Sequence, residues 1–254
     1  MTASAVVRFY AELNDLLAAD ERFRDVEHPV GVGETVKDLI ESRGVPHAEV
    51  DLILVNGEPV DFDRRVTDGD RIAAYPVFES LDISSIGRLR PDPLRTTRFV
   101  LDGHLGTLAR YLRLCGFDTL YRNDIDDEEL AAISRAERRV LLTRDVGVLK
   151  RKAVTHGYFV RATSPRDQLV ETVRRFDLSG DLQPFTRCMK CNGLLVPVTK
   201  QDVIDELEPG TARSYDEFLR CSGCASVYWR GAHYEKLLAL VEAARSPASS
   251  AGRG

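Results

Sequence analysis

The stretch "RVLLTRD", residues 139–145, is a short apolar run that ends on an aspartate. Its centre, Val140–Leu142, has the character of a strand that is covered on both faces, as strands of a parallel sheet are. The stretch "RFVLD", residues 98–102, has the same form. Two buried strands that each end in an acid, Asp145 and Asp102, decide the fold that we expect for the middle of the chain.

Strands and helices alternate around these two stretches. The expected strands are "RFVLD", "FDTLY", "RVLLTRD" and "YFVRA", and helical segments such as "DDEELAAISRAE" and "SPRDQLVETVRRF" lie between or after them. This alternation predicts right-handed crossovers and a mostly parallel sheet. Ligands of such sheets bind beyond the carboxyl ends of the strands, where we expect Asp102 and Asp145.

Two carboxylates at one edge of a sheet repel each other unless a cation lies between them. Oxygen ligands suit Mg²⁺ or Mn²⁺, and the loop "RNDIDDEE" adds further acids, among them Asp124 and Asp127. Such ions activate water and stabilise the leaving oxygen of a phosphodiester. In the alternative interpretation, Asp145 caps the helical segment "VGVLKRKA" and Asp127 complements the positive end of a helix.

Four of the five cysteines form two Cys-x-x-Cys pairs that are separated by 29 residues. In a reducing cytoplasm this spacing favours a structural zinc site over disulfides. Four thiolates form a closed tetrahedral site, as in a zinc ribbon, and leave no open position for water. The predicted zinc ribbon is therefore not the catalytic centre. The expected zinc ligands are Cys188, Cys191, Cys221 and Cys224, whereas Cys115 is expected in the core.

Basic and aromatic side chains surround the paired cysteines, a mixture suited to phosphate contact and base stacking. The aromatic rings are equally compatible with a ribbon core. Residues 1–86 carry a net charge of −10 and residues 87–254 one of +5, which favours the second part as a binder of polyanions. The predicted nucleic-acid contacts are Lys190, Arg220, Trp229 and Arg230.

The N-terminal segment has the pattern of a β-grasp domain. Residues 5–10 alternate like a strand, and Thr35 and Asp38 have the spacing of a capping box at the start of a helix. Two stretches, "LILVNGEPVD" and "VTDGDRIAAYPVF", follow, with Asn-Gly and Asp-Gly turn signals beside apolar strands. A strand pair, a helix and another strand pair are the β-grasp order.

The chain resembles a known family, the PIN-like RNases of the Mut-seven C-terminal type, which carry a zinc ribbon. The matching stretches include "VLDGHLGTLARYLRLCGFDTLY", "NDIDDEELAAI", "VLLTRD", "RCMKCNGLL" and "RCSGCASVYWRGAHYEKL". The resemblance implies that Asp102, Asp127 and Asp145 bind the catalytic metal, with Asp124 as a weaker candidate. The N-terminal segment looks like the sulfur-carrier β-grasp proteins and like the ubiquitin-like domain that is sometimes fused to this core. It lacks a terminal Gly-Gly, so we expect a docking module for a protein partner.

The expected architecture is α/β and α+β multidomain, with a β-grasp domain, a central PIN-like parallel-sheet α/β core and a C-terminal zinc ribbon. We expect a metal-dependent ribonuclease that uses Mg²⁺ or Mn²⁺ and holds RNA partly with its ribbon. The alternative is a non-enzymatic RNA-binding adaptor that joins a zinc ribbon to a β-grasp docking module. The chain lacks a signal peptide and any apolar run near the roughly 20 residues that span a bilayer, so a cytoplasmic location is expected. The expected boundaries are 1–84 for the β-grasp domain, 85–97 for a linker, 98–181 for the core, 182–240 for the ribbon and 241–254 for a disordered tail.

Overall fold

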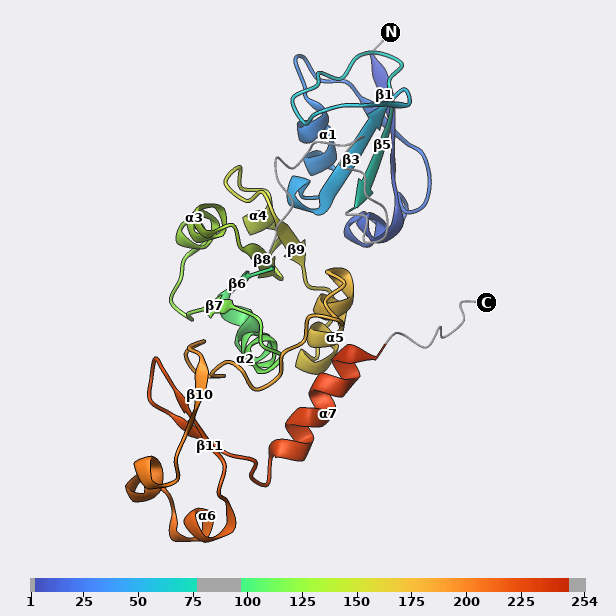
Figure 1. Ribbon diagram of the computed structural model, residues 1–254. Helices are drawn as coiled ribbons and strands as arrows, with labels where there is room; N and C mark the ends of the chain where they lie inside the picture. Colours follow the sequence, from blue (N-terminus) through green and yellow to red (C-terminus); the bar gives the residue numbers. More distant parts are fainter. Residues whose placement is uncertain (1–2, 77–96, 247–254) are drawn as a thin grey trace. The chain divides into compact units, whose positions relative to one another are not determined.

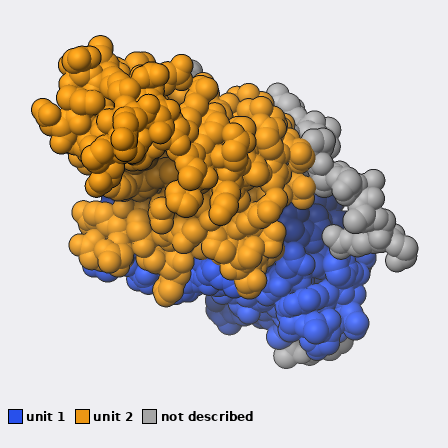
Figure 2. All heavy atoms as spheres, turned by 90° about the horizontal axis from the view of Figure 1, so that it is seen from below, with its two compact units in different colours: residues 1–96, 126–159 blue, residues 97–125, 160–254 orange. Residues whose placement is uncertain are grey.

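The computed structural model describes residues 3–76 and 97–246 (Figure 1). The chain divides into two compact units, residues 1–96 with 126–159 and residues 97–125 with 160–254 (Figure 2). Almost all of the predicted linker, 85–97, lies outside the described residues. Within the described ranges, no helix combines the length and the apolar character that crossing a membrane requires.

The N-terminal part of the first unit is a β-grasp domain, as the sequence predicted. Its five-stranded sheet has the order β2-β1-β5-β3-β4 and is mixed, because β1 runs parallel to β5 while the other neighbours are antiparallel. The α1 helix and two 3-10 turns complete the domain (Figure 1). The elements are β1 (Ser4–Phe9), η1 (Ala11–Leu16), β2 (Val26–Pro29), α1 (Val36–Ser42), η2 (His47–Glu49), β3 (Val50–Val55), β4 (Glu58–Pro59) and β5 (Arg71–Pro76).

Local sequence signals set the ends of these elements. The predicted capping box is present at the start of α1, where the Thr35 hydroxyl accepts from the backbone N–H of Asp38 at 3.2 Å and the Asp38 carboxylate accepts from the N–H of Thr35 at 3.0 Å. Asn56 and Gly57 join β3 to β4 with positive φ angles of 54° and 89°. A tight hairpin turn with two left-handed residues requires this dipeptide. The core of the domain includes the buried side chains of Val7, Phe9, Leu39, Ile40, Ile53 and Ile72.

The rest of the first unit is one half of the α/β core. It contains α3 (Asp127–Glu137), β8 (Val140–Thr143), α4 (Val146–Leu149) and β9 (Gly157–Phe159), and β8 runs parallel to β9. Every residue of β8 is buried, as predicted for a strand covered on both faces. The β-grasp domain contacts this half directly, since the Glu49 carboxylate accepts from the N–H of Phe159 and Lys150 Nζ donates to the Glu41 carbonyl at 2.7 Å.

The second unit supplies the other half of the core. It contains β6 (Phe99–Leu101), η3 (Gly103–Leu105), α2 (Gly106–Leu114), β7 (Thr119–Tyr121) and α5 (Pro165–Arg175), and β6 runs parallel to β7. The strand order of the core sheet is β7-β6-β8-β9. The α5 helix lies in the segment that was predicted to be helical, and it begins with the Ser164 hydroxyl accepting from the N–H of Asp167 and with Pro165 in the first turn. The central domain is therefore an α/β core with a parallel sheet.

The ribbon completes the second unit. Strands β10 (Leu195–Val198), β11 (Phe218–Cys221) and β12 (Val227–Tyr228) form an antiparallel sheet, and η4 (Gln201–Glu206) and α6 (Pro209–Ser214) lie between β10 and β11. The last helix, α7 (Tyr234–Arg245), packs against α5 and α2 (Figure 1). The sequence predicted a disordered tail from residue 241, but residues 241–245 are helical, because Val241 and Ala244 are buried on one face of α7. Residues 247–254 lie outside the described residues.

A pH-dependent contribution to stability is expected from Asp70, a buried carboxylate of the β-grasp domain. It accepts from Thr67 N at 2.8 Å, from the Thr67 hydroxyl at 3.0 Å and from Asn56 Nδ2 at 2.9 Å. Burial raises the pKa of Asp70, but these bonds, together with Arg64, hold the pKa below its ordinary value. Because the folded pKa is the lower one, the stabilisation is present above the unfolded pKa of about 4 and is lost as pH falls through the folded pKa.

We expect Asp70→Asn to lower the free energy of unfolding by about 1–3 kcal/mol at neutral pH, since a hydrogen-bonded buried charge is lost. The difference from the wild type should shrink as pH falls below about 4. Urea unfolding of the full chain at several pH values measures both effects, with the exposed Asp20→Asn as the matched control. A difference that does not change with pH would contradict this role of Asp70.

Candidate functional site

The four paired cysteines converge on one point of the second unit. Their sulfur atoms all lie within 4.8 Å of one another, with 3.6 Å between Cys188 and Cys224 and 3.3 Å between Cys191 and Cys221. A tetrahedral zinc site with Zn–S bonds of about 2.3 Å separates its sulfurs by roughly 3.8 Å. The donor set therefore fits a metal such as zinc, and the C-terminal segment is compatible with a zinc ribbon.

Both cysteine pairs are shaped as turns that bring the backbone close to sulfur. The N–H groups of Gly223 and Cys224 point at the Cys221 sulfur, at 3.3 and 3.4 Å. The residue after each second cysteine, Asn192 or Ala225, is left-handed, with φ of 73° and 59°. A Cβ atom on Gly193 would lie 2.9 Å from the Cys221 sulfur. The two turns approach each other closely because glycine occupies that position.

Hydrogen bonds favour the thiolate form of Cys224 and Cys188, whereas burial raises the pKa of Cys191 to about 12. The Ser226 hydroxyl and N–H lower the pKa of Cys224 to about 6. Burial raises the pKa of Cys188, but the Tyr228 hydroxyl, 3.1 Å from the Cys188 sulfur, and backbone N–H groups lower it below its ordinary value. Thiolates are the form that binds metal.

The first cysteine turn is bonded to the α/β core by a buried arginine of α2. Arg113 donates from Nε to the Thr119 carbonyl at 2.9 Å, and from Nη1 to the carbonyls of Lys190 at 2.9 Å and Met189 at 3.3 Å. Burial lowers the pKa of Arg113, and the thiolates of Cys191 and Cys188 counteract this effect. A single guanidinium thus joins α2, the start of β7 and the cysteine turn.

Asn192 attaches the same turn to the edge of the core. Its Oδ1 accepts from the N–H of Thr119, the first residue of β7, at 3.0 Å, and its Nδ2 donates to Asp118 Oδ1 at 2.8 Å. Neither the Arg113 nor the Asn192 attachment was predicted from the sequence. A signal existed for Arg113, which follows the buried Ala109 by four residues, so the helical period places it on the buried face of α2.

The predicted metal-binding acids cap helical turns that follow buried strands, with Asp102 directly after β6 and Asp145 two residues after the end of β8. Asp145 Oδ1 accepts from Gly147 N at 2.7 Å at the start of α4, and its own N–H donates to the Thr143 hydroxyl at 2.9 Å. Asp102 is buried, and its Oδ1 accepts from His104 N at 2.8 Å at the start of η3. The helix-cap interpretation thus describes a bond that each aspartate makes. A carboxylate has about four lone-pair sites, so a cap bond does not by itself use all of its acceptors.

The two remaining predicted acids are exposed. Asp126, not Asp127, caps α3, and Asp127 is the first residue of that helix, 3.5 Å from Arg151 Nη2. Asp124 lies in the loop before α3, 3.5 Å from Arg122 Nε. Asp127 and Asp145 belong to the first unit, whereas Asp102 and Asp124 belong to the second.

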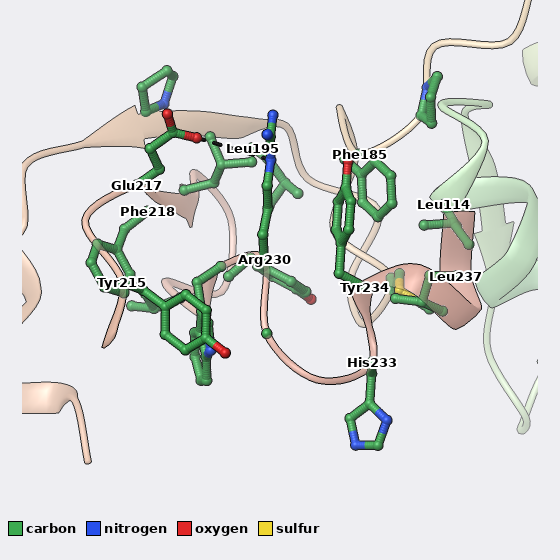
Figure 3. A pocket seen from close by; sticks show the side chains of 18 of the residues that line it. Leu114, Phe185, Leu195, Tyr215, Glu217, Phe218, Arg230, His233, Tyr234 and Leu237 are labelled. Carbon is green, nitrogen blue, oxygen red and sulfur yellow. Dashed lines mark ion pairs between the residues drawn. The ribbon is translucent and has the colours of Figure 1, made fainter. Parts of the chain in front are cut away.

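The predicted nucleic-acid contacts fall into two groups. Trp229 and Arg230 line a pocket of about 1070 Å³ in the second unit (Figure 3). Lys190 instead donates to the Ser226 hydroxyl at 3.3 Å, and Arg220 donates to Glu206 Oε1 at 2.5 Å and to a backbone carbonyl. The aromatic residues lining the pocket are Phe185, Tyr215, Phe218, Tyr228, Trp229 and Tyr234.

A mixed-sheet β-grasp domain, a parallel-sheet α/β core and a four-cysteine cluster together define a multidomain α/β and α+β protein. Residues 97–241 match the model of the Mut7-C RNAse domain, more than half of the chain, so the chain belongs to this family. Residues 2–82 match the model of the Mut7-C ubiquitin domain. The architecture that the sequence predicted is confirmed. Comparison with curated proteins and with solved structures gave no match.

We expect the purified chain to contain one zinc ion, because four thiolates at these distances form a closed site. Cys221→Ser should remove the zinc and unfold the ribbon, since metal binding contributes to the folding free energy of such domains, while the β-grasp domain stays folded. Elemental analysis and limited proteolysis measure the two effects. Stable folded protein with little zinc would contradict the assignment.

Arg113→Met should speed the loss of zinc to a chelator by about tenfold or more, because groups that support metal ligands typically contribute 10- to 100-fold to affinity. The matched control is Arg110→Met, which changes an exposed arginine of the same helix. The measurement is the rate of zinc transfer to a coloured chelator. Equal rates in the two variants would show that the buried guanidinium does not support the site.

Proposed function

We propose that this chain is a metal-dependent ribonuclease of the cytoplasm, in which the PIN-like core cleaves RNA phosphodiester bonds and the ribbon holds the RNA. The observation that carries the proposal is the match of residues 97–241 to the Mut7-C RNAse domain. Two further features support it: Asp102 and Asp145 each follow a buried strand, and residues 87–254 carry a net charge of +5.

The proposed catalytic metal is Mg²⁺ or Mn²⁺, held by Asp102, Asp127 and Asp145, with Asp124 as an additional acid. Hard divalent cations prefer carboxylate oxygens, so the chemistry of this donor set fits them. When bound, such an ion supplies Lewis-acid stabilisation of the leaving oxygen and lowers the pKa of water. The zinc that we assign to the four cysteines is structural, since a closed site has no open position.

The chain's own contribution is to hold the carboxylates in place. Asp145 is fixed from both sides, by the N–H of Gly147 on its carboxylate and by the Thr143 hydroxyl on its backbone N–H. The Asp102 carboxylate accepts from the N–H of His104. Asp127 makes an exposed ion pair with Arg151, which contributes little to its position. Two acids are thus held by backbone bonds and one is free to adjust.

We propose that the β-grasp domain is a docking module for a protein partner. The η2 segment of the β-grasp domain already contacts the core, because the Glu49 carboxylate accepts a hydrogen bond from the N–H of Phe159. Residues 1–86 carry a net charge of −10, so the exposed surface of the domain favours a basic partner.

A second candidate function is a non-enzymatic RNA-binding adaptor. The observation that favours it is the cap bond that Asp102 and Asp145 each make, because a cap role needs no metal. Replacing one of these acids by its amide separates the two candidates, since asparagine is also a good helix cap.

Asp145→Asn should lower RNA cleavage by about 100-fold or more, because it removes a negatively charged metal ligand and keeps the shape of the side chain. Its melting temperature without metal should hold or rise, since asparagine retains the cap and one charge of an acidic cluster is gone. The measurements are cleavage of a mixed cellular RNA pool with Mn²⁺, Mg²⁺ or chelator, and thermal unfolding.

The matched control is Asp38→Asn, which changes an aspartate that is also bonded at a helix start, in the β-grasp domain. Its cleavage rate should equal that of the wild type. Undiminished metal-dependent cleavage by Asp145→Asn would place the active site elsewhere, and no cleavage by the wild type under any metal would favour the adaptor.

A further inference from the structure

The pocket of the second unit is lined by aliphatic side chains, by six aromatic side chains and by two arginines and two acids. Its volume of about 1070 Å³ is at the upper end of the roughly 300–1,000 Å³ typical of sites that bury a small ligand. Figure 3 shows Tyr215 and Phe218 on one side, Tyr234 and Phe185 on the other, and Arg230 between the two sides.

Tyr234 has one ring face covered by protein and one covered only by an arginine. The Phe185 ring stacks on Tyr234, with 4.8 Å between the centroids and 24° between the planes. On the other side, the guanidinium carbon of Arg230 lies 5.5 Å from the Tyr234 centroid (Figure 3). A flat ligand that enters between Arg230 and Tyr234 would extend this stack by one layer.

Arg230 is held in this position by weak contacts. Its side chain is 69% exposed, and the nearest carboxylate oxygen, Glu217 Oε2, is 3.9 Å away on a side chain that is 82% exposed. Ion pairs between exposed side chains contribute little to stability, so Arg230 can move aside at small cost. Once displaced, its guanidinium is available to stack on the new layer or to bind a phosphate.

We infer that this pocket binds a nucleobase of single-stranded RNA, stacked on Tyr234, with Arg230 exchanging Glu217 for the adjoining phosphate. The inference rests on the proposed function of the ribbon in holding RNA and names the part of RNA that it recognises. Every base offers a flat aromatic face, and an arginine beside that face suits the phosphate that accompanies it. The net charge of +5 on residues 87–254 favours this polyanion over an uncharged peptide.

The β-grasp domain supplies a matched comparison. Tyr10 and Tyr75 stack at 4.3 Å and 13°, and the guanidinium carbon of Arg8 lies 5.6 Å from the Tyr10 ring. The same three-layer arrangement therefore occurs in the acidic N-terminal part of the chain, and these residues do not line the pocket. The pocket beside Tyr234, and not the stack alone, is the feature from which we infer binding.

Trp229 reports on the pocket directly. It is the single tryptophan of the chain, it lines the pocket, and it is 41% exposed. The experiment is a titration of the zinc-loaded full chain, without Mg²⁺ or Mn²⁺, with a short oligoadenylate, while the fluorescence of Trp229 is followed. The comparison probes are an abasic ribose-phosphate oligomer of the same length and a proline-rich peptide.

The oligoadenylate should quench Trp229, and the abasic oligomer should bind at least tenfold more weakly. Tyr234→Leu should weaken oligoadenylate binding by about 5- to 150-fold, the range that corresponds to loss of one stacked base. Glu217→Gln should tighten binding, because the carboxylate that competes for Arg230 is gone. Tyr10→Leu is the matched control and should bind as the wild type does.

Arg230→Ala and Glu217→Gln change exposed side chains, so they test the inference even if Tyr234→Leu fails to fold, which zinc content and melting temperature reveal. The inference would be overturned if the abasic oligomer bound as tightly as the oligoadenylate, or if Tyr10→Leu weakened binding as much as Tyr234→Leu. Unchanged affinity in both Arg230→Ala and Glu217→Gln would also overturn it. Quenching of Trp229 by the proline-rich peptide in competition with oligoadenylate would make the pocket a peptide site and overturn it too.

The failure of this inference is distinguishable from the failure of the proposed nuclease. Binding is measured without the catalytic metal, and Asp145→Asn should leave it unchanged. Base-dependent binding without any cleavage would support the pocket and reject the nuclease. If cleavage depended on Asp145 but oligoadenylate affinity did not change on substitution of Arg230 or Glu217, the proposed nuclease activity would be supported and base binding in the pocket would be rejected.

Discussion

The guanidinium of Arg113 is the contact on which the second unit depends. A buried charge is costly unless its donors are satisfied, and Arg113 satisfies them with carbonyls of Thr119, Met189 and Lys190. Two backbone bonds run beside it, from Gln183 N to the Cys115 carbonyl and from Phe185 N to the Leu114 carbonyl. The chain that leads into the ribbon is thereby laid along the end of α2.

This attachment also places the pocket. Phe185 is fixed by its bond to the end of α2, and Tyr234 begins the helix α7 that packs back on the core. The two rings stack because both chain segments are tied to the same helix layer. The cysteine cluster and the aromatic rings of the pocket are thus oriented by the α/β core, although these residues follow the core in the sequence.

Much of the fold could be predicted from the sequence because its signals are local. The Thr35–Asp38 box, the Ser164 cap and the two cysteine pairs each act within a few residues, and the structure contains all of them. The roles of Arg113 and Asn192 could not be predicted, because their partners are distant in sequence. The type of a polar residue does not indicate which distant residue it will hydrogen-bond. Residues 241–245 were predicted to be disordered because they lie close to a serine-rich terminus, which is typical of a tail.

The acids show a different limit. A position that ends a strand and begins a helix is where both a metal ligand and a helix cap belong, so the residue type alone could not separate the two roles. Asp102 and Asp145 make cap bonds with one oxygen each. The cap bond orients the carboxylate, which also suits a metal ligand, so the two interpretations are compatible in the same side chain.

Each outer strand of the core sheet is hydrogen-bonded to a side chain of a flanking domain. In the order β7-β6-β8-β9 the outer strands are β7 and β9, and an N–H of each donates to a side-chain oxygen, Thr119 to Asn192 of the ribbon and Phe159 to Glu49 of the β-grasp domain. Exposed strand edges pair with other chains. A core cut free of both neighbours would present two such edges and recruit strands from its own copies, so the flanking domains keep the sheet at four strands.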